Sequence, residues 1–241
     1  MAWFKDWFNS PYYHLLYGKR DEKEAETFIH HLVDQLQPEK SCKMLDLACG
    51  KGRHAIILSE SGFDVTGLDL SENSIQEAKQ HETPQLHFAV HDMRKPFSNQ
   101  TFDYVFNLFT SFGYFENEAD NLQTLQSIHQ ALKPNGVLVQ DYFNAERLLQ
   151  HFRNEENKIL KDIEFSISKR IINDRIVKTI RFNDHGHAYE FQEKVSLFSY
   201  RDFQAMYLET GFEILDVFGD YNLNAFNGET SERLILISRK I

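Results

Sequence analysis

The sequence lacks the features on which secreted, membrane-spanning and nucleic-acid-binding proteins depend. Only two of its 241 residues are cysteines, so no disulfide framework is indicated and a reducing cytoplasm is the expected setting. No apolar run approaches the ~20 residues of a membrane helix, and the charges at Lys5 and Asp6 come too early for a secretory signal. The net charge of −10 provides no general field for a polyanion, so we expect neither nucleic acid nor a membrane as a partner.

The sequence does contain an alternation of short β-rich runs with helical patterns. Apolar residues at helical spacing predict a helix from Asp21 to Leu36, and Ser71 is a suitable N-cap for a helix to Gln80. Such alternation predicts one α/β domain over 1–241 with a doubly wound, mostly parallel sheet. Seven strands are expected at 43–47, 64–69, 86–90, 102–108, 137–142, 213–218 and 234–238, with further helices at about 53–61 and 119–132 and a turn at Lys133–Gly136.

An insertion follows the fifth strand, where apolar and polar residues begin to alternate. Three such runs lie between about 157 and 198, separated by turn signals at 173–174 and 184–186. They predict a three-stranded antiparallel β meander beside the carboxyl edge of the sheet, where ligands of open α/β sheets bind. Because its apolar face must be covered, we expect a lid or acceptor wall, with Tyr189 and Phe191 as trial wall positions. A dimer interface is the alternative.

The first strand leads into a loop with two glycines. Gly50 and Gly52 lack a Cβ where a tight turn must form and where a cofactor can touch bare backbone at the carboxyl end of a strand. Asp69 ends the second strand 17 residues beyond Gly52, which suits an acceptor for ribose hydroxyls. The pattern predicts a nucleoside-containing cofactor at this edge of the sheet.

Asp46 distinguishes the two cofactor classes that use this arrangement. Gly50, Gly52 and Ala55 also fit the fingerprint of dinucleotide-binding proteins, in which a pyrophosphate lies against the loop and the helix N-terminus. Asp46 would then repel like charge by roughly a few kcal/mol in a partly dry cleft. S-adenosylmethionine carries a sulfonium and an ammonium, so the same carboxylate attracts it. The residues therefore favour the cationic cofactor and leave an NAD-dependent oxidoreductase as the alternative.

Five fragments in order resemble the class I S-adenosylmethionine-dependent methyltransferases. They are LDLACGKG at 45–52, GLDLS at 67–71, HDM at 91–93 with Pro96-Phe97, FDYVFN at 102–107 and LKPNGVL at 132–138. Ala48 departs from the pattern, since many family members have the first glycine of their loop there, but its small side chain should preserve close approach. The resemblance spans most of the chain and implies a small-molecule methyltransferase with a Rossmann-like sheet that ends in one antiparallel strand.

The resemblance also implies roles for single residues around S-adenosylmethionine. Asp46, Gly50 and Gly52, with Ala48 between them, would frame its methionine part. Asn107 would lie where the fourth strand meets the same part. The ribose and adenine contacts would come from the ends of the second and third strands, at Asp69, Leu70, Asp92 and Met93.

N-terminal helices within about 1–40 would fold over the cofactor, again by resemblance. Tyr13 and Tyr17 are four residues apart, which places both rings on one helix face. Arg20 follows them and can form a bidentate pair with a carboxylate, such as that of the cofactor. We therefore expect Tyr13, Tyr17 and Arg20 beside the methionine end.

Methyl transfer requires little covalent chemistry of the protein. An electrophilic methyl group must meet a nucleophile in line, so alignment supplies much of the acceleration. A general base is needed only for a protonated acceptor, and the candidates near the acceptor mouth are Tyr114, Tyr142 and Asn144, each more often a wall residue than a catalyst. The eleven histidines show no metal-ligand pattern, so no metal is expected.

These features predict a cytoplasmic S-adenosylmethionine-dependent methyltransferase, a monomer or homodimer, that transfers a methyl group to a small-molecule acceptor by in-line displacement. Two alternatives from other classes stay open, an NAD-dependent oxidoreductase and a non-catalytic module that binds S-adenosylmethionine. The sequence does not identify the acceptor or its nucleophilic atom, because oxygen, nitrogen, sulfur and carbon nucleophiles all use this scaffold.

Overall fold

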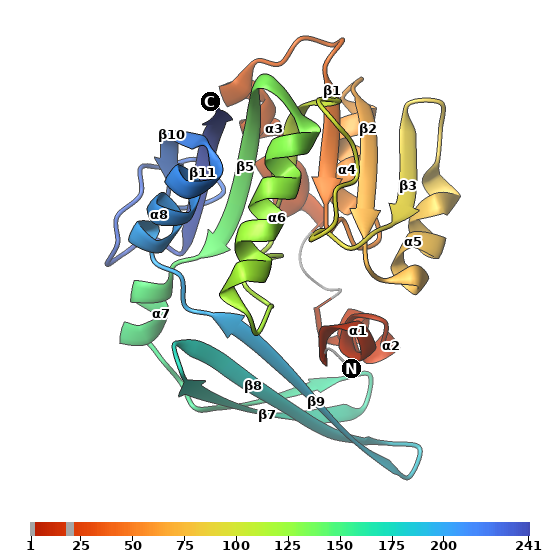
Figure 1. Ribbon diagram of the computed structural model, residues 1–241. Helices are drawn as coiled ribbons and strands as arrows, with labels where there is room; N and C mark the ends of the chain where they lie inside the picture. The colour runs from red at the N-terminus through yellow and green to blue at the C-terminus, as the bar shows by residue number, and fades with distance from the viewer. Residues whose placement is uncertain (1–2, 18–21) are drawn as a thin grey trace.

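The computed structural model describes residues 3–17 and 22–241, and its largest element is a seven-stranded sheet (Figure 1). Its strands are β1 (Lys43–Leu47), β2 (Asp64–Asp69), β3 (Leu86–Val90), β4 (Phe102–Asn107), β5 (Leu132–Phe143), β10 (Phe212–Phe218) and β11 (Arg233–Lys240). The strand order is β10-β11-β5-β4-β1-β2-β3, and β11 runs antiparallel to both of its neighbours. The predicted mostly parallel sheet with a final antiparallel strand is confirmed.

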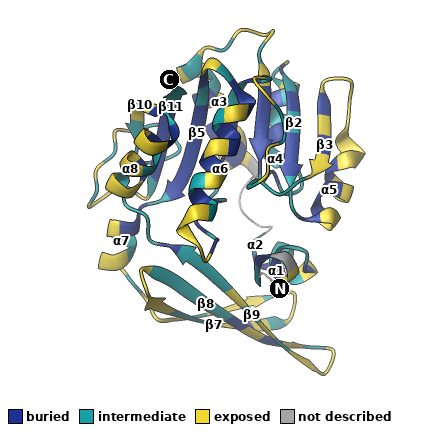
Figure 2. Cartoon of the chain, in the orientation of Figure 1, coloured by how far each residue is buried: buried dark blue, intermediate teal, exposed yellow. Residues whose placement is uncertain are grey.

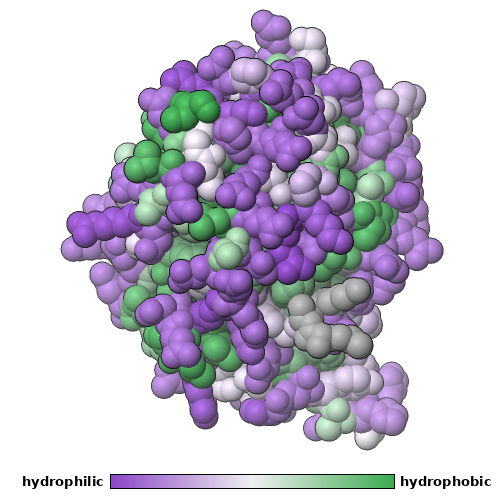
Figure 3. Space-filling model, viewed as in Figure 1, coloured by the Kyte–Doolittle hydropathy of each residue, from purple (hydrophilic) through white to green (hydrophobic). Residues whose placement is uncertain are grey.

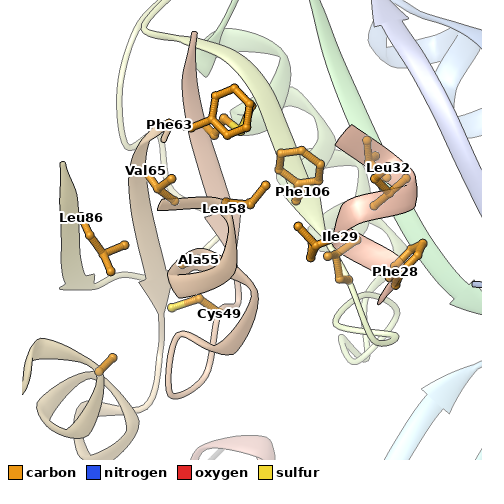
Figure 4. Packing of buried hydrophobic residues seen from close by; sticks show 14 of the residues in the cluster. Phe28, Ile29, Leu32, Cys49, Ala55, Leu58, Phe63, Val65, Leu86 and Phe106 are labelled. Atoms are coloured by element: carbon orange, nitrogen blue, oxygen red, sulfur yellow. The ribbon is translucent and has the colours of Figure 1, made fainter. Parts of the chain in front are cut away.

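Helices cover both faces of this sheet, as a doubly wound fold requires. The first face carries α3 (Glu22–Leu36), α4 (Arg53–Glu60) and α5 (Glu72–Ala78), and the second carries α6 (Glu118–Ala131) and α8 (Tyr200–Thr210). Phe28 of α3, Leu58 of α4 and Phe106 of β4 belong to one buried cluster (Figure 4). Burying a side chain of this size contributes ~1.5–3 kcal/mol. This layer therefore fixes α3 and α4 against the sheet.

Side-chain caps determine where the later helices begin. Ser71 Oγ accepts a hydrogen bond from Ser74 N at 3.2 Å and caps α5, as predicted. A capping box of Ser199 and Asp202 begins α8, and Gly211, with φ 80°, ends it. Because Ser71 follows β2 after one intervening residue, its cap fixes the start of α5 beside the carboxyl end of that strand.

The predicted turn at Lys133–Gly136 is wrong in one respect, because these residues lie within β5. Phe102 pairs with Leu132, and the next pair joins Tyr104 to Val137, so β5 carries extra residues that bulge out of the ladder. Asn135 has a φ of 61° within this bulge. The turn-forming residues Lys133–Gly136 therefore do bend the chain. They form a bulge inside β5, whereas the sequence predicted a turn before the strand begins.

A second sheet, which we call the insert (155–196), follows the short helix α7 (Ala145–Gln150). It contains β6 (Glu155–Leu160), β7 (Ile163–Ile172), β8 (Arg175–Asp184) and β9 (His187–Ser196), all antiparallel and in sequential order. The prediction of three strands was therefore one strand short. The sequence of β6, EENKIL, is mostly exposed and shows no apolar alternation, so only its pairing with β7 identifies it.

Two N-terminal helices, α1 (Trp3–Phe8) and α2 (Pro11–Tyr17), lie between the insert and the main sheet (Figure 1). We call residues 3–17 the cover. Trp7 and Leu16 of the cover form one buried cluster with inward-facing residues of the insert, namely Phe165, Ile167, Ile180 and Phe182. The apolar face of the insert is therefore covered within the chain, and a second copy is not needed to shield it.

Buried and exposed residues are distributed as expected for a sheet that is covered by helices. β5 is largely buried (Figure 2), and the visible face of the molecule is mainly hydrophilic with scattered apolar residues (Figure 3). On the insert, Ser166, Arg181 and Glu190 form an exposed cross-strand row opposite to the face that meets the cover. Within the described residues, no helix combines the length and apolar character needed to cross a membrane.

Gly67 tests the packing beneath the glycine loop. A Cβ at Gly67 would lie 2.4 Å from the Phe88 ring and 3.0 Å from Cys49 Sγ. We expect Gly67→Ala to lower the free energy of unfolding by about 1–3 kcal/mol, because overpacking forces the ring to move. Urea unfolding measures this change. Adding Phe88→Leu should recover part of the loss, and an unchanged unfolding free energy in Gly67→Ala would contradict the packing.

Candidate functional site

A cavity of about 780 Å³ lies at the carboxyl edge of the main sheet, between that edge and the cover. It is where the topology of an open α/β sheet places a ligand. Most of the residues that the sequence assigned to a cofactor line it, namely Tyr13, Tyr17, Asp46, Ala48, Gly50, Asp69, Leu70, Asp92 and Met93. Residues more than 70 positions apart in the sequence therefore meet around one space.

The loop after β1 has the backbone conformation that its glycines predict. Gly50 has a φ of 57°, and a Cβ built on it would meet nothing within 4 Å, so this backbone borders open space in the cavity. Ala48 has a φ of 63°, which explains why a glycine suits this position in the resembling family. Gly52 differs from the prediction, because it does not line the cavity. Its Cβ would lie 2.5 Å from the Phe88 ring, so Gly52 serves turn formation and packing.

Asp46 is a buried carboxyl group at the floor of the cavity. It is 1% exposed, and its Oδ2 accepts a hydrogen bond from Ala55 N at 3.1 Å, in the first turn of α4. Burial raises the pKa of Asp46 from 3.8 to about 7, and the Ala55 N–H opposes the rise only in part. A cation placed beside Asp46 would favour its ionised form.

Asp69 joins the loops that follow β1 and β2. Its Oδ2 accepts from Gly50 N at 2.8 Å, and its Oδ1 accepts from Ser71 N at 2.8 Å. Burial raises the pKa of Asp69, and these backbone donors oppose the rise. Each carboxylate oxygen keeps a further lone pair for a donor in the cavity.

Asp92 is held in place by an arginine that the sequence analysis did not identify. Arg94 forms a bidentate pair with it, from Nε to Oδ1 at 3.0 Å and from Nη2 to Oδ2 at 2.6 Å. Arg94 also donates to Asp120 Oδ2 at 3.0 Å, which ties the loop after β3 to α6. Since the guanidinium lowers the pKa of Asp92, this carboxylate stays ionised at the cavity wall. The sequence order Asp92-Met93-Arg94 could have indicated this ion pair, because side chains two residues apart in a turn can contact each other.

The cover supplies the opposite wall. The Tyr13 and Tyr17 rings lie 5.1 Å apart, as predicted for one helix face, and both line the cavity. Asn9 Oδ1 accepts from Ser71 Oγ at 2.6 Å, so the cover contacts the start of α5 across the cavity. Arg20 lies outside the described residues.

Asn107 is placed differently from the prediction. Its side chain is fully buried, donates to Leu47 O at 2.9 Å and accepts from Gln140 Nε2 at 2.7 Å. The amide therefore joins β4 to β1 and β5, and Asn107 does not line the cavity. Leu108 and Phe109, the next two residues, do line it.

Two of the three general-base candidates are also placed away from the cavity. Tyr142 is fully buried, and its hydroxyl donates to Ser196 O at 2.5 Å. Asn144 caps α7, and its amide donates to Gly228 O at 2.8 Å and Ser231 O at 2.9 Å. Only Tyr114 lines the cavity, with its hydroxyl donating to Thr110 O.

The trial wall positions on the insert, Tyr189 and Phe191, are wrong for a related reason. Both pack in the cluster between insert and cover, and neither lines the cavity. The Phe191 ring lies 4.5 Å from that of Trp7 in the cover. A period-two pattern shows that a strand has an apolar face, but not which element covers that face.

The loop after β4 depends on a buried ion pair that sequence reasoning missed. Phe109 and Thr110 have φ values of 59° and 61°, a backbone conformation that residues other than glycine rarely adopt. Asp141 Oδ2 accepts from Phe109 N at 2.8 Å, and Arg233 pairs with Asp141 at 2.7 Å and donates to Thr110 Oγ1 at 3.0 Å. This network holds the Phe109 ring at the cavity wall. No local pattern links Asp141 to Arg233, which is 92 residues away.

His54 also lies at the wall but offers little acid–base capacity. It is buried at the start of α4, and its ring lies 5.4 Å from that of Phe109. Burial lowers the pKa of His54 to about 3, so the imidazole is neutral at ordinary pH. Among the described residues, no three His, Cys, Asp or Glu side chains gather as metal ligands would.

Comparisons with known proteins agree with this geometry. A family model described as a methyltransferase domain matches residues 38–194. A putative methyltransferase, YqeM of Bacillus subtilis (strain 168), is 31% identical over 223 residues, which cover 86% of this chain and 87% of that protein. A solved S-adenosylmethionine-dependent methyltransferase from Clostridium acetobutylicum ATCC 824 superposes with a TM-score of 0.79 at 20% identity, covering 95% of this chain and 96% of its own. CalS10, an amino pentose methyltransferase from Micromonospora echinaspora solved with S-adenosylmethionine bound, superposes with a TM-score of 0.70 at 19% identity over 96% and 98% of the two chains.

The raised pKa of Asp46 has a consequence for stability. Between pH ~4 and ~7 the folded carboxyl is protonated while the unfolded one is ionised, so this group lowers the unfolding free energy as pH rises, by on the order of 4 kcal/mol in total. Asp46→Asn removes this dependence yet keeps an acceptor for Ala55 N. We therefore expect the variant to lose less stability than the parent between pH 5 and pH 8 in urea unfolding. Equal losses would contradict the assignment.

Proposed function

The chain belongs to the methyltransferase domain family, and on that premise we propose that it transfers the methyl group of S-adenosylmethionine to a small-molecule acceptor by in-line displacement. The observation that carries the proposal is the buried carboxyl group of Asp46 beside the open backbone of Gly50. A cationic ligand gains from this carboxylate, whereas an anionic one is repelled.

The residues present fit this cofactor better than a dinucleotide. Pyrophosphates bind free N–H groups at a helix N-terminus. Here Asp46 Oδ2 already accepts from Ala55 N in the first turn of α4, so a carboxylate stands where the pyrophosphate of NAD would have to lie. The same carboxylate is complementary to the sulfonium and ammonium of S-adenosylmethionine. This geometry favours the methyltransferase reading over the oxidoreductase alternative.

We assign the parts of the cofactor to the cavity as follows. Asp69 accepts from the ribose hydroxyls with the lone pairs that Gly50 N and Ser71 N leave unused. Asp92, oriented by Arg94, accepts from the adenine amino group beside Met93. The methionine part lies between Asp46 and the cover. When bound, the cofactor supplies an electrophilic methyl group on its sulfonium.

The chain itself positions the acceptor and excludes water. The acceptor end of the cavity is bounded by aromatic side chains of the cover and of the loop after β4, namely Phe4, Phe8, Phe109, Tyr114 and Phe115. The Phe8 and Tyr114 rings lie 5.3 Å apart and those of Phe4 and Phe115 5.9 Å apart, so cover and loop close this end together. Alignment inside such an enclosure can contribute on the order of 7–11 kcal/mol to catalysis.

This enclosure supports the proposal of a small acceptor, because the cover lies across the cavity. The amino pentose acceptor named for CalS10 supports the same class.

Tyr114 is the remaining base candidate at the wall, although its hydroxyl already donates to Thr110 O. We assign Tyr114 to orienting the acceptor, since a nucleophile with a free lone pair needs no base. A non-catalytic binding module remains the competing reading, and release of methylated product from a metabolite mixture with labelled cofactor decides between them.

Asp69 provides the sharpest test of the cofactor. Asp69→Ala removes charge-assisted hydrogen bonds worth roughly 1.5–3 kcal/mol each, so affinity for S-adenosylmethionine should fall at least about tenfold in isothermal titration. Asp64→Asn is the matched control, because Asp64 begins the same strand but pairs with Lys43 at the surface. The control should bind as the parent does, and the parent should not bind NAD. Parental affinity in a folded Asp69→Ala protein would contradict the assignment of Asp69 to the ribose hydroxyls.

A further inference from the structure

Among the described residues, the insert contributes none to the cavity wall, although it follows β5 and α7 in the chain. Its inner face is instead in contact with the cover. Trp7 of α1 is fully buried against Phe191, and Tyr12 of α2 lies 4.5 Å from Phe182 and 5.0 Å from Tyr189 between ring centroids. The insert therefore meets the cavity indirectly, through the cover and through the loop after β4, where Ser196 N donates to Gly113 O at 2.9 Å.

A polar cluster centred on Glu193 of β9 lies within this aromatic contact. Glu193 Oε1 accepts from Trp7 Nε1 at 2.7 Å and from the Tyr17 hydroxyl at 2.7 Å. Its Oε2 lies 3.3 Å from Lys178 Nζ on the adjacent strand, and Lys178 also contacts the Tyr17 hydroxyl. One carboxylate thus binds both helices of the cover to the insert.

The pair of Glu193 and Lys178 is largely shielded from water. Their side chains are 14% and 16% exposed, respectively. Removing one member of such a pair leaves the other charge buried and uncompensated, which costs far more than breaking a surface ion pair. The three groups around Glu193 are all donors, so the carboxylate is also their shared acceptor. Glu193 is therefore the central polar contact of the docked cover, beside the aromatic packing and the Tyr12 hydroxyl, which donates to Asp184 Oδ2 at 2.7 Å.

The opposite side of the cover meets the cofactor end of the cavity. Tyr13, His14 and Tyr17 line the cavity, and Asn9 accepts from Ser71 Oγ, two residues beyond Asp69. Tyr17 is the link between the two sides, because it borders the cavity while its hydroxyl donates to Glu193. A change at Glu193 is therefore transmitted to the cavity directly through Tyr17, and also through Trp7, whose ring lies 5.7 Å from that of Tyr13.

We propose that Glu193 is a positioning residue for the cofactor, and that the insert is the docking platform that holds the cover closed over it. Glu193 acts through Tyr17 and Trp7 and touches no ligand itself. This inference rests on the proposed function. It assigns the insert a role in cofactor affinity, in place of the acceptor wall or dimer interface that its sequence pattern suggested.

Population arithmetic gives the size of the effect. If the cavity binds the cofactor tightly only with the cover docked, the apparent dissociation constant rises by the inverse of the docked fraction. A docked fraction reduced to about one tenth thus weakens binding about tenfold. Cofactor binding should in turn favour the docked cover, because linkage is reciprocal.

The chain offers a direct optical probe of docking. Its only two tryptophans, Trp3 and Trp7, both lie in α1, so intrinsic tryptophan fluorescence reports on the cover alone. We expect Glu193→Gln to shift the emission to longer wavelength without ligand. The neutral amide leaves the buried Lys178 charge uncompensated and offers one acceptor oxygen to three donors, so the cover undocks and Trp7 loses its apolar surroundings. We also expect the variant's affinity for S-adenosylmethionine to be at least about tenfold weaker than that of the parent in isothermal titration. Saturating cofactor should partly reverse the emission shift.

Glu190→Gln is the matched control, because Glu190 lies on the same strand but on the exposed face, where it pairs with Arg181. It should retain parental emission and affinity. Circular dichroism establishes that each variant is folded. If Glu193→Gln does not fold, Trp7→Phe takes its place. It loses one bond to Glu193 but keeps a ring against Phe191, and it should weaken affinity in the same direction.

Three results separate the possible failures. A parent protein that does not bind S-adenosylmethionine contradicts the proposed function. A parent that binds, together with a folded Glu193→Gln of unchanged emission, contradicts Glu193 as the docking residue. A shifted emission with parental affinity contradicts the coupling between cover and cofactor. In the Trp7→Phe variant, parental affinity overturns the inference in the same way.

Discussion

The carboxylate of Asp69 is the interaction on which the site depends most. It binds Gly50 N and Ser71 N, so one side chain fixes both the loop after β1 and the turn that starts α5. Glycine at positions 50 and 52 permits the backbone to reach it, because both positions have positive φ. The Phe88 ring then fills the space under Gly52 and Gly67. A strand end, two loops and a helix start are thereby set around one cavity before any ligand arrives.

Much of this arrangement follows from local sequence. The order of strand, glycine loop, helix and acidic strand end is encoded within positions 43–71, where spacing alone predicts which residues share the carboxyl edge of the sheet. Ser71 could be recognised as a cap because capping needs only residues within one turn. Nine predicted residues line the cavity. Periodicity located the strand ends and the helix face on which most of them lie, and the resemblance to the methyltransferase family implied which of them meet the cofactor.

The predictions that the structure corrects have a different cause. They depend on side chains or strands that are distant in the sequence, and such partners leave no local pattern. Asn107 stands at a strand end, but Leu47 and Gln140 draw its amide into the sheet. Tyr142 is likewise turned away by Ser196, 54 residues later. The strand β6 has no apolar alternation, so its membership of the insert depends entirely on pairing with β7. Nothing in the local sequence distinguishes Glu193 from other strand residues, because its partners Trp7 and Tyr17 lie on the distant helices α1 and α2.

The molecule thus combines a hydrogen-bonded floor, made by the sheet and Asp69, with a cover that packs against the insert. The most direct test of this account is a crystal structure of the protein with S-adenosylhomocysteine, the product of the proposed transfer. The account predicts ribose hydroxyls within hydrogen-bond distance of Asp69, adenine beside Asp92, and the methionine part between Asp46 and Tyr17. A nucleoside bound elsewhere, or one whose ribose is turned away from Asp69, would contradict it.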